Sequence, residues 1–223
     1  MHARSINIRG NPTNLDTGIA YVRDQVLPTV KETEGCIGLS MLADRESGRC
    51  IVATAWADEQ AMRETAEEDR TFRHRLLHTL GGEHADVQEW EIAILHRNRP
   101  AGDGAGAQVT WARITPNHVD DLLDAYRSNL MPKLQELLGF RSLSMLVDRR
   151  TGRTVSVTSF ETRDAASLVR KHAKSLREQF AQAMGARILD VAEMDLVLAH
   201  LRAPETVRKG QSSNDRTASA APP

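Results

Sequence analysis

The chain has 223 residues, of which 40% are hydrophobic and 26% are charged, a composition typical of ordinary folded domains. Its 29 basic and 30 acidic residues are mixed along the chain and leave a net charge of −1, so we expect neither nucleic acid nor a membrane surface as a partner. No apolar segment near the N-terminus has the length of a signal peptide or a membrane span, and we therefore expect a cytoplasmic protein.

The chain carries a tandem duplication. Shifted by 104 residues, it aligns with itself without a gap over residues 9–97, and 23 of the 89 aligned pairs are identical. The densest match lies between residues 39–49 and 143–153, where Leu-Ser-Met-Leu, Asp-Arg and Gly-Arg recur. A period this long exceeds that of solenoid repeats, so each copy is predicted to fold around its own core.

The elements of each copy follow from hydrophobic periodicity and turn residues. The first copy contains in order a strand, an amphipathic helix, two hairpin strands, a second helix and a last strand, over residues 5–9, 15–30, 36–44, 49–57, 58–80 and 87–96. Pro28 and Pro132 are predicted to kink or restart the first helix at the same place in both copies. Each copy therefore has the order βαββαβ.

This order predicts an α+β fold of tandem ferredoxin-like repeats, each an antiparallel sheet with both helices on one face. Small residues alternate with larger ones along the first hairpin, which indicates a sheet that is apolar on both faces. We therefore expect the two open faces to stack, as in an intramolecular dimer. The predicted boundaries are a first repeat at 1–97, a glycine-rich linker at 98–107, a second repeat at 108–202 and a disordered tail at 203–223.

Three segments resemble the antibiotic biosynthesis monooxygenase superfamily of dimeric α+β barrels. They are the run from Gly35 to Leu39, the junction from Trp56 to Ala61, and the closing stretch from Glu89 to Ile92. The resemblance covers both copies and implies that the repeats form one intramolecular dimeric α+β barrel. Members of the superfamily include cofactor-free oxygenases, haem-degrading enzymes and proteins without a known activity, so fold transfers better than function.

The haem-degrading members use an Asn on the first strand, a Trp along the second helix and a His nine residues after that Trp. This chain has Asn7 and His74 at two of these positions, but Thr65 stands at the Trp position. The second copy matches none of the three. The resemblance thus names Asn7 and His74 as candidate catalytic residues and leaves haem as an alternative to a site without a cofactor.

Bulky side chains are candidates for lining a ligand cavity between helices and sheet. Trp56, Trp90 and Trp111 are large enough to do so, although core packing also explains each of them. By resemblance to the cofactor-free oxygenases, Asn7 would stabilise a substrate anion that reacts with oxygen.

Two pairs of histidines are candidate binding groups. His96 and His200 recur at the end of the last strand, where they could face each other and close a pocket mouth, or only cap a strand end. His74 and His78 have a spacing that suits a metal, but helical geometry turns His74 toward solvent, so we expect no metal site.

Two further pairs have structural interpretations. Cys36 and Cys50 fall near opposite ends of the predicted hairpin, which indicates free thiols. The duplicated Glu89 is expected to form a cross-strand salt bridge with Arg9.

The sequence therefore favours a barrel protein that binds a small apolar or aromatic molecule, with cofactor-independent oxygenase activity in the first copy through Asn7. The rival hypothesis is a non-enzymatic stress-associated or ligand-sensing protein with a degenerate site. Haem binding through His74 is the third hypothesis. Self-association into a homo-oligomer is left open.

Overall fold

A computed structural model describes residues 1–99 and 104–202. Within them, strands close into one antiparallel barrel in the order β1-β3-β2-β8-β5-β7-β6-β4. Their bounds are β1 His2–Arg9, β2 Cys36–Asp44, β3 Arg49–Trp56, β4 Ala85–Arg97, β5 Ala105–Arg113, β6 Phe140–Asp148, β7 Arg153–Phe160 and β8 Arg187–Leu201. The N-terminal repeat supplies β1–β4 and the C-terminal repeat supplies β5–β8. The antiparallel pairs β2·β8 and β4·β6 join the two sheets, as the stacking prediction required.

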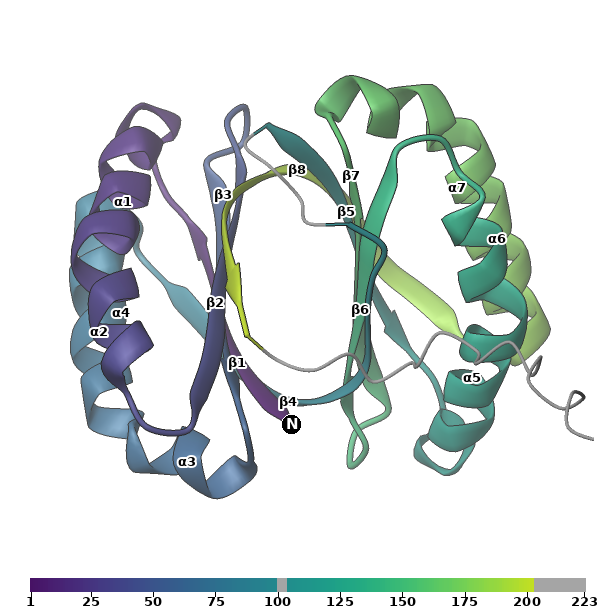
Figure 1. The fold of residues 1–223 in the computed structure, drawn as a ribbon, viewed down its shortest axis with the longest axis horizontal. Coiled ribbons are helices and arrows are strands. Elements are labelled where there is room, and N and C mark those ends of the chain that lie inside the picture. The colour runs from purple at the N-terminus through teal and green to yellow at the C-terminus, as the bar shows by residue number, and fades with distance from the viewer. Residues whose placement is uncertain (100–103, 203–223) are drawn as a thin grey trace, which may run out of the picture.

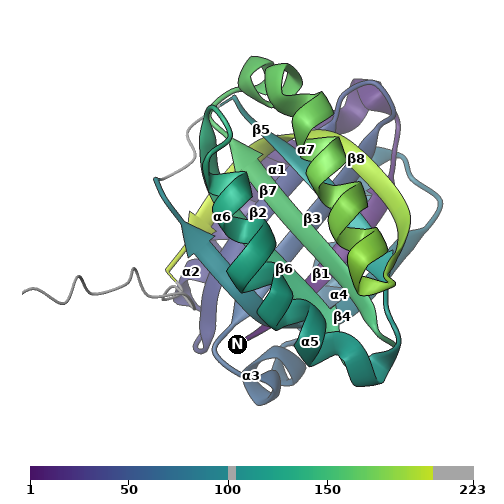
Figure 2. The same ribbon diagram turned by 90° about the vertical axis from the view of Figure 1, so that its right-hand side faces the viewer.

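Helices cover the outer face of each sheet (Figures 1 and 2). The N-terminal repeat carries α1 Leu15–Tyr21, α2 Leu27–Glu32, α3 Glu59–Glu64 and α4 Ala66–Leu80. The C-terminal repeat carries α5 Val119–Ala125, α6 Met131–Gln135 and α7 Arg163–Met184. Figure 1 shows the barrel between these two helical layers, so each strand has one face toward helices and one toward the barrel interior.

Capping and breaking residues set the helix bounds. Asp58 accepts a hydrogen bond from the Ala61 amide at 2.9 Å, and Thr162 accepts one from Ala165 at 3.0 Å, so both caps are side-chain oxygens at helix starts. Gly81 and Gly185 end α4 and α7 in the left-handed conformation.

The first helix of each repeat is interrupted at equivalent places. A π-helical segment, Val22–Val26 or Tyr126–Leu130, precedes the helix that restarts with proline at its second residue. This confirms the predicted restart at Pro28 and Pro132. The second helix differs between the repeats, because α3 and α4 break at Thr65 whereas α7 is continuous.

Three apolar cores result. One lies under the helices of the N-terminal repeat and one under those of the C-terminal repeat. The third lines the barrel interior and draws on both repeats, from Ala3 and Trp90 to Trp111 and Met194. The repeats therefore share a core that neither could bury alone.

Several local predictions can be compared with the coordinates. Cys36 and Cys50 are free thiols, with Cys36 opposite Trp56 at one end of the hairpin and Cys50 opposite Ala43 near the other. β5 begins at Ala105, inside the segment predicted as linker, and the predicted tail lies outside the described residues. No helix in residues 1–99 and 104–202 combines the length and apolar content needed to cross a membrane.

Candidate functional site

The barrel interior contains a cavity of about 380 Å³. Strand alternation directs every second side chain inward, and most of the inward side chains are small or apolar. Among them are Ala3, Leu42, Ile51, Ile92, Val109 and Leu146. No carboxylate of the described residues lines the cavity, while Arg97 and Arg99 do. A cavity of this size and character accepts a small apolar molecule.

Asn7 is the most distinctive polar group of the cavity wall. It lies on β1 opposite Ile51 of β3, and its Oδ1 is buried without a hydrogen-bond partner in the described part of the chain. Asn7 also lines a groove on the outer surface beside Arg9, Arg49 and His84. A buried acceptor without a partner is costly to keep, so its presence at a cavity wall marks a place where a ligand can bind.

Two tryptophans face the interior from opposite repeats. The indole N–H of Trp90 donates to Ser5 Oγ at 2.9 Å, which satisfies its polar atom and holds its ring against the cavity. The Arg49 guanidinium lies 4.1 Å from the Trp111 ring centre and pairs with Asp190 at 2.7 Å. Trp111 is therefore held under an ion pair that joins β3 to β8 at this end of the barrel.

Hydroxyls and a guanidinium line the end of the barrel cavity opposite Trp111. The Oγ atoms of Ser142 and Ser159 are 2.5 Å apart, and both residues line the cavity. Arg97 on β4 donates to the Leu201 carbonyl on β8 at 3.0 Å. Because β4 and β8 lie on opposite sides of the barrel, Arg97 reaches across its end.

The structure places Trp56, Thr65 and His74 away from this cavity. Trp56 is buried on the helix-facing side of β3 and donates to Thr54 Oγ1 at 3.0 Å. Thr65 Oγ1 donates to the Met62 carbonyl at the break between α3 and α4. Of the predicted aromatic set, only Trp90 and Trp111 join Asn7, and they do so inside the barrel, not between helices and sheet as the sequence suggested.

The predicted haem constellation is not assembled. His74 is exposed on α4, which covers the outer face of the sheet, whereas Asn7 lines the barrel interior on the other face. The sheet therefore separates the two residues. A haem iron ligated by His74 would not reach Asn7, and the pairing inferred from the resemblance is wrong for this chain.

His96 and His200 do not face each other. They lie on β4 and β8, which are opposite strands of the barrel, and His96 Nε2 contacts Gln135 Nε2 of α6 at 2.7 Å on the outside. The His96 ring also stacks on Phe140. His200 lies at the cavity rim, where burial and then the charges of Lys31 and Arg202 lower the pKa of its imidazole.

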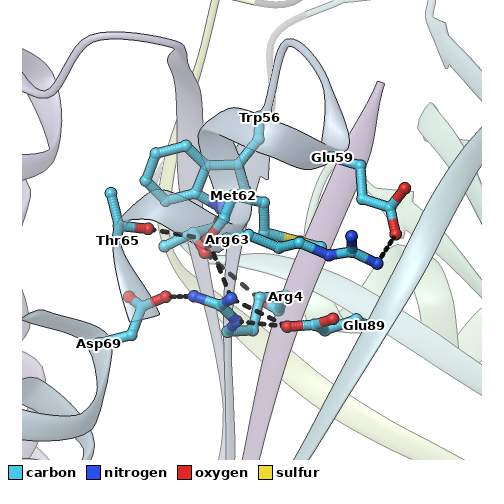
Figure 3. A network of polar contacts seen from close by, with 9 residues as sticks. Arg4, Trp56, Glu59, Met62, Arg63, Thr65, Asp69 and Glu89 are labelled. Carbon is cyan, nitrogen blue, oxygen red and sulfur yellow. Dashed lines mark hydrogen bonds and ion pairs between the residues drawn. The ribbon is translucent and has the colours of Figure 1, made fainter. Parts of the chain in front are cut away.

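A buried ion-pair network ties β1 to the helices of the N-terminal repeat (Figure 3). Arg4 pairs with Glu89 at 2.8 Å, forms an ion pair with Asp69 and donates to the Met62 carbonyl at 2.9 Å. The predicted partner of Glu89 was Arg9, and this is wrong because the β1·β4 register places Arg4 opposite Glu89. The network lies on the helix-facing side of the sheet, so it stabilises the fold and forms no part of the cavity wall.

Sequence reasoning missed the hydroxyl and small-residue walls of the cavity. Gly38, Ser40, Ala53 and Ala55 all line it, and their alternation with larger residues was the available signal. That alternation was taken to indicate close packing of two sheets. Because small side chains on facing sheets fall short of the barrel axis, they leave space there.

The arrangement can enclose an aromatic or aliphatic molecule and present one amide to it. An Asn amide offers one acceptor oxygen and two donor hydrogens, so Asn7 can orient a hydroxyl or stabilise an oxyanion. Trp90 and Trp111 supply flat apolar surfaces for a ring.

No protein-family model matches the chain. Two proteins of Mycobacterium tuberculosis are similar to it over nearly its whole length. "Uncharacterized protein Rv2558" is 42% identical over 208 residues, which cover 93% of this chain and 88% of that protein. "Uncharacterized protein Rv2557" is 41% identical over 207 residues, which cover 93% of this chain and 92% of that protein.

Solved structures resemble the chain in fold. A candidate monooxygenase of Fusobacterium nucleatum has a TM-score of 0.69 at 13% identity and covers 93% of this chain and 97% of its own. An anthrone oxidase-like protein has a TM-score of 0.61 at 14% identity, with coverage of 91% and 94%. A Listeria monocytogenes ferredoxin-fold protein related to antibiotic biosynthesis monooxygenases has a TM-score of 0.50 at 7% identity, with coverage of 87% and 94%. The chain therefore belongs to the same family as the two mycobacterial proteins. With its tandem repeats closed into one α+β barrel, it shares the fold of these solved structures.

Proposed function

We propose that the barrel interior binds a small apolar or aromatic molecule, and that Asn7 fixes a hydroxyl or enolate oxygen of this molecule for reaction with oxygen. The observation that carries the proposal is the 380 Å³ apolar cavity with the Asn7 carboxamide in its wall, where no described residue hydrogen-bonds the Asn7 Oδ1. Oδ1 can accept from a hydroxyl of the bound molecule, and Nδ2 can donate to the oxyanion that this hydroxyl forms. Trp90 and Trp111 support it, because each presents its ring to the same space from a different repeat.

In this reaction the protein needs only to position the substrate and to stabilise its negative charge. A phenolic or anthrone-like substrate carries its own electron-rich carbon once its hydroxyl is ionised. Asn7 Nδ2 would donate to that oxyanion, in a cavity where a donor counts for more than in water. Arg97 at the barrel end supplies a positive charge that favours the anion at longer range.

Binding can be tested with single-tryptophan variants. N-phenyl-1-naphthylamine is the probe, and energy transfer to it is measured from a chain that keeps only Trp90 and from one that keeps only Trp56. We expect strong saturable quenching of Trp90. Trp56 is the matched control, since it is buried on the other face of the sheet, and its quenching should be weaker.

Turnover can be tested with anthrone, which the fold similarity to an anthrone oxidase-like protein suggests as a probe. Anthrone and one O₂ give anthraquinone and one H₂O, so oxygen uptake and quinone absorbance should rise in a one-to-one ratio. Asn7→Ala is expected to lower kcat by about 100-fold, the usual cost of one oxyanion donor. Asn129→Ala, at an exposed position in the other repeat, should leave kcat unchanged.

The outcomes separate the hypotheses. Saturable binding without oxygen uptake would favour the non-enzymatic ligand-sensing alternative and remove the oxygenase step. Equal quenching of Trp56 and Trp90, or no quenching of either, would contradict the site itself.

A further inference from the structure

A second, smaller cavity of about 50 Å³ lies between the helices and the sheet of the C-terminal repeat. Its floor is the outer face of β5 and β7, and its roof comes from the π-helical segment and from α7. It lies on the other side of the sheet from the barrel cavity and shares none of its lining residues. It was not among the sites that the sequence suggested.

This cavity has hydroxyl groups in its wall at positions where the first repeat has none. Its wall includes Tyr126, Thr110, Thr154 and Ser156, and the residues 104 positions earlier are Val22, Ile6, Cys50 and Val52. Tyr126 is 4% exposed, and burial raises the pKa of its hydroxyl to about 12, against the smaller opposing effect of Ser156. Hydroxyls replace methyl groups at equivalent positions of the same fold. Packing alone gives no reason for such a change, because buried polar groups weaken a core unless they are satisfied.

The charge at the cavity is also compensated differently. In the N-terminal repeat, Arg4 pairs with the carboxylates of Asp69 and Glu89. In the C-terminal repeat the residues equivalent to Arg4 and Asp69 are Gln108 and Ala173, so both the cation and one of its acids are lost from these positions.

A different cation takes that place. Arg177 on α7 reaches down from the roof and hydrogen-bonds the Gln108 side-chain oxygen. Its Nε is buried without a partner, and it has no ion pair within residues 1–99 and 104–202. Burial lowers the pKa of Arg177, and the nearby charges of Glu178 and Glu193 only partly oppose this effect.

The acids nearest to Arg177 do not enter the cavity. Glu178 is exposed on α7 and lies 3.8 Å from Lys174. Glu193 is paired with Arg170 at 2.5 Å. Neither lines the cavity, and no carboxylate is among the described residues that do. Inside the cavity, the Arg177 side chain is therefore surrounded by hydroxyls, an amide and apolar carbons.

We propose that this cavity is a binding site for a small oxyanion, a carboxylate or an anion of similar size, held by the Arg177 guanidinium and the hydroxyls of Tyr126 and its neighbours. A water needs about 10–15 Å³ of such space, so the cavity admits a ligand of roughly three to four non-hydrogen atoms. Formate, acetate, nitrate and bicarbonate fall in this range. The carboxylate that Asp69 provides in the first repeat would here come from the ligand.

The test follows the Nε–H resonance of Arg177 by NMR in the full chain, during titration with sodium formate and with sodium nitrate at constant ionic strength. Arg177→Lys identifies the resonance by its loss. We expect a saturable shift of this signal, with at least tenfold weaker binding in Tyr126→Phe. Arg73→Lys, at the equivalent helix position of the first repeat, is the matched control and should leave the titration unchanged.

A second variant distinguishes an anion-binding site from a packing defect that binds nothing. Ala173→Asp restores the acid of the first repeat and should abolish formate binding by supplying an internal carboxylate. A Tm measurement checks that this variant folds. No saturable shift with either anion, or equal shifts across the other arginine Nε–H signals, would overturn the proposal.

Discussion

At the residue scale, the two repeats use different side chains to hold an arginine between their helices and their sheet. Arg4 comes from a strand and meets an acid from a helix, whereas Arg177 comes from a helix and meets an amide from a strand. Sequence identity between the copies did not reveal this, because Arg73 and Arg177 are identical while their surroundings differ. Breaking a buried ion pair leaves a charge without water or partner, which costs far more than breaking an exposed one.

The Arg4 network gives a stability prediction. Arg4→Gln leaves Asp69, only 14% exposed, without its cation and should cost about 3 kcal/mol in urea unfolding. The double variant Arg4→Gln/Asp69→Ala reproduces the side chains of the second repeat and should recover at least half of that loss. Arg23→Gln, which breaks the exposed pair with Asp24, should leave the urea midpoint nearly unchanged. A double variant as unstable as the single one would contradict this account.

Two buried acids make stability fall at high pH. Burial raises the pKa of the Cys50 thiol and of the Tyr126 hydroxyl to about 12 each, so the unfolded chain releases these protons first. Their contributions are complete below about pH 9 and are lost as pH rises through 12, at up to about 1.4 kcal/mol per pH unit for each group. Urea midpoints of Cys50→Ala/Tyr126→Phe should therefore fall less steeply from pH 9 to 11 than those of the parent chain. Parallel curves would show that neither group is buried as described.

At the element scale, each hairpin turn packs against the end of the first strand of its repeat. Gly152 has a positive φ of 68°, and a Cβ there would collide with the carbonyl oxygen of Ile114. The Ile114 amide donates to the Gly152 carbonyl at 2.9 Å, so the turn is held against the end of β5. The same contact joins Gly48 to Gly10 in the first repeat.

A pair of alanine substitutions tests this turn. Gly185→Ala adds a methyl group in open space at a similar φ and should cost about 1–2 kcal/mol from backbone strain. Gly152→Ala adds the collision to the same strain and should cost on the order of 3 kcal/mol or more. Thermal unfolding of both variants gives the comparison. Equal losses would mean that the turn is free to move away from Ile114.

The elements and their order were predictable from sequence. Which side chains of a strand face the helices, and which residues they pair with, was predictable only in part. The restarts at Pro28 and Pro132 are local signals, and the structure confirms them. The glycine turns and the caps at Asp58 and Thr162 are local features of the same kind. The segment between β1 and β4 contains α1 to α4 and the β2–β3 hairpin, so the register of β4 on β1, and with it the pairing of Glu89 with Arg4, could not be derived from local signals.

Only part of the predicted residue set lines the barrel cavity, because Trp56, Thr65, His74 and His96 lie elsewhere. Asn7, Trp90 and Trp111 share one cavity, and strand parity alone would have put Asn7 on the face opposite Ile6 and Ile8. The polar cavity of the C-terminal repeat was missed, although Thr110 and Ser156 interrupt the apolar pattern that Ile6 and Val52 keep.

At the scale of the whole molecule, closure of the barrel makes the repeats interdependent. Their common core lies inside the barrel, and β2·β8 and β4·β6 are the seams that join the two sheets. Unfolding either repeat would expose the inner face of the other. We therefore predict one cooperative transition, with the fluorescence of Trp56 in the first repeat and Trp111 in the second lost at the same urea concentration in single-tryptophan variants. Separate midpoints would mean that the repeats unfold independently.

The most direct measurement of the central claim is a crystal structure of the full chain grown with 4-bromophenol, in which anomalous scattering locates the bromine. The account predicts a bromine peak inside the barrel between Trp90 and Trp111, with the phenol oxygen within hydrogen-bond distance of the Asn7 amide. A barrel interior filled by side chains, with bromine only on the surface or under the helices, would contradict it.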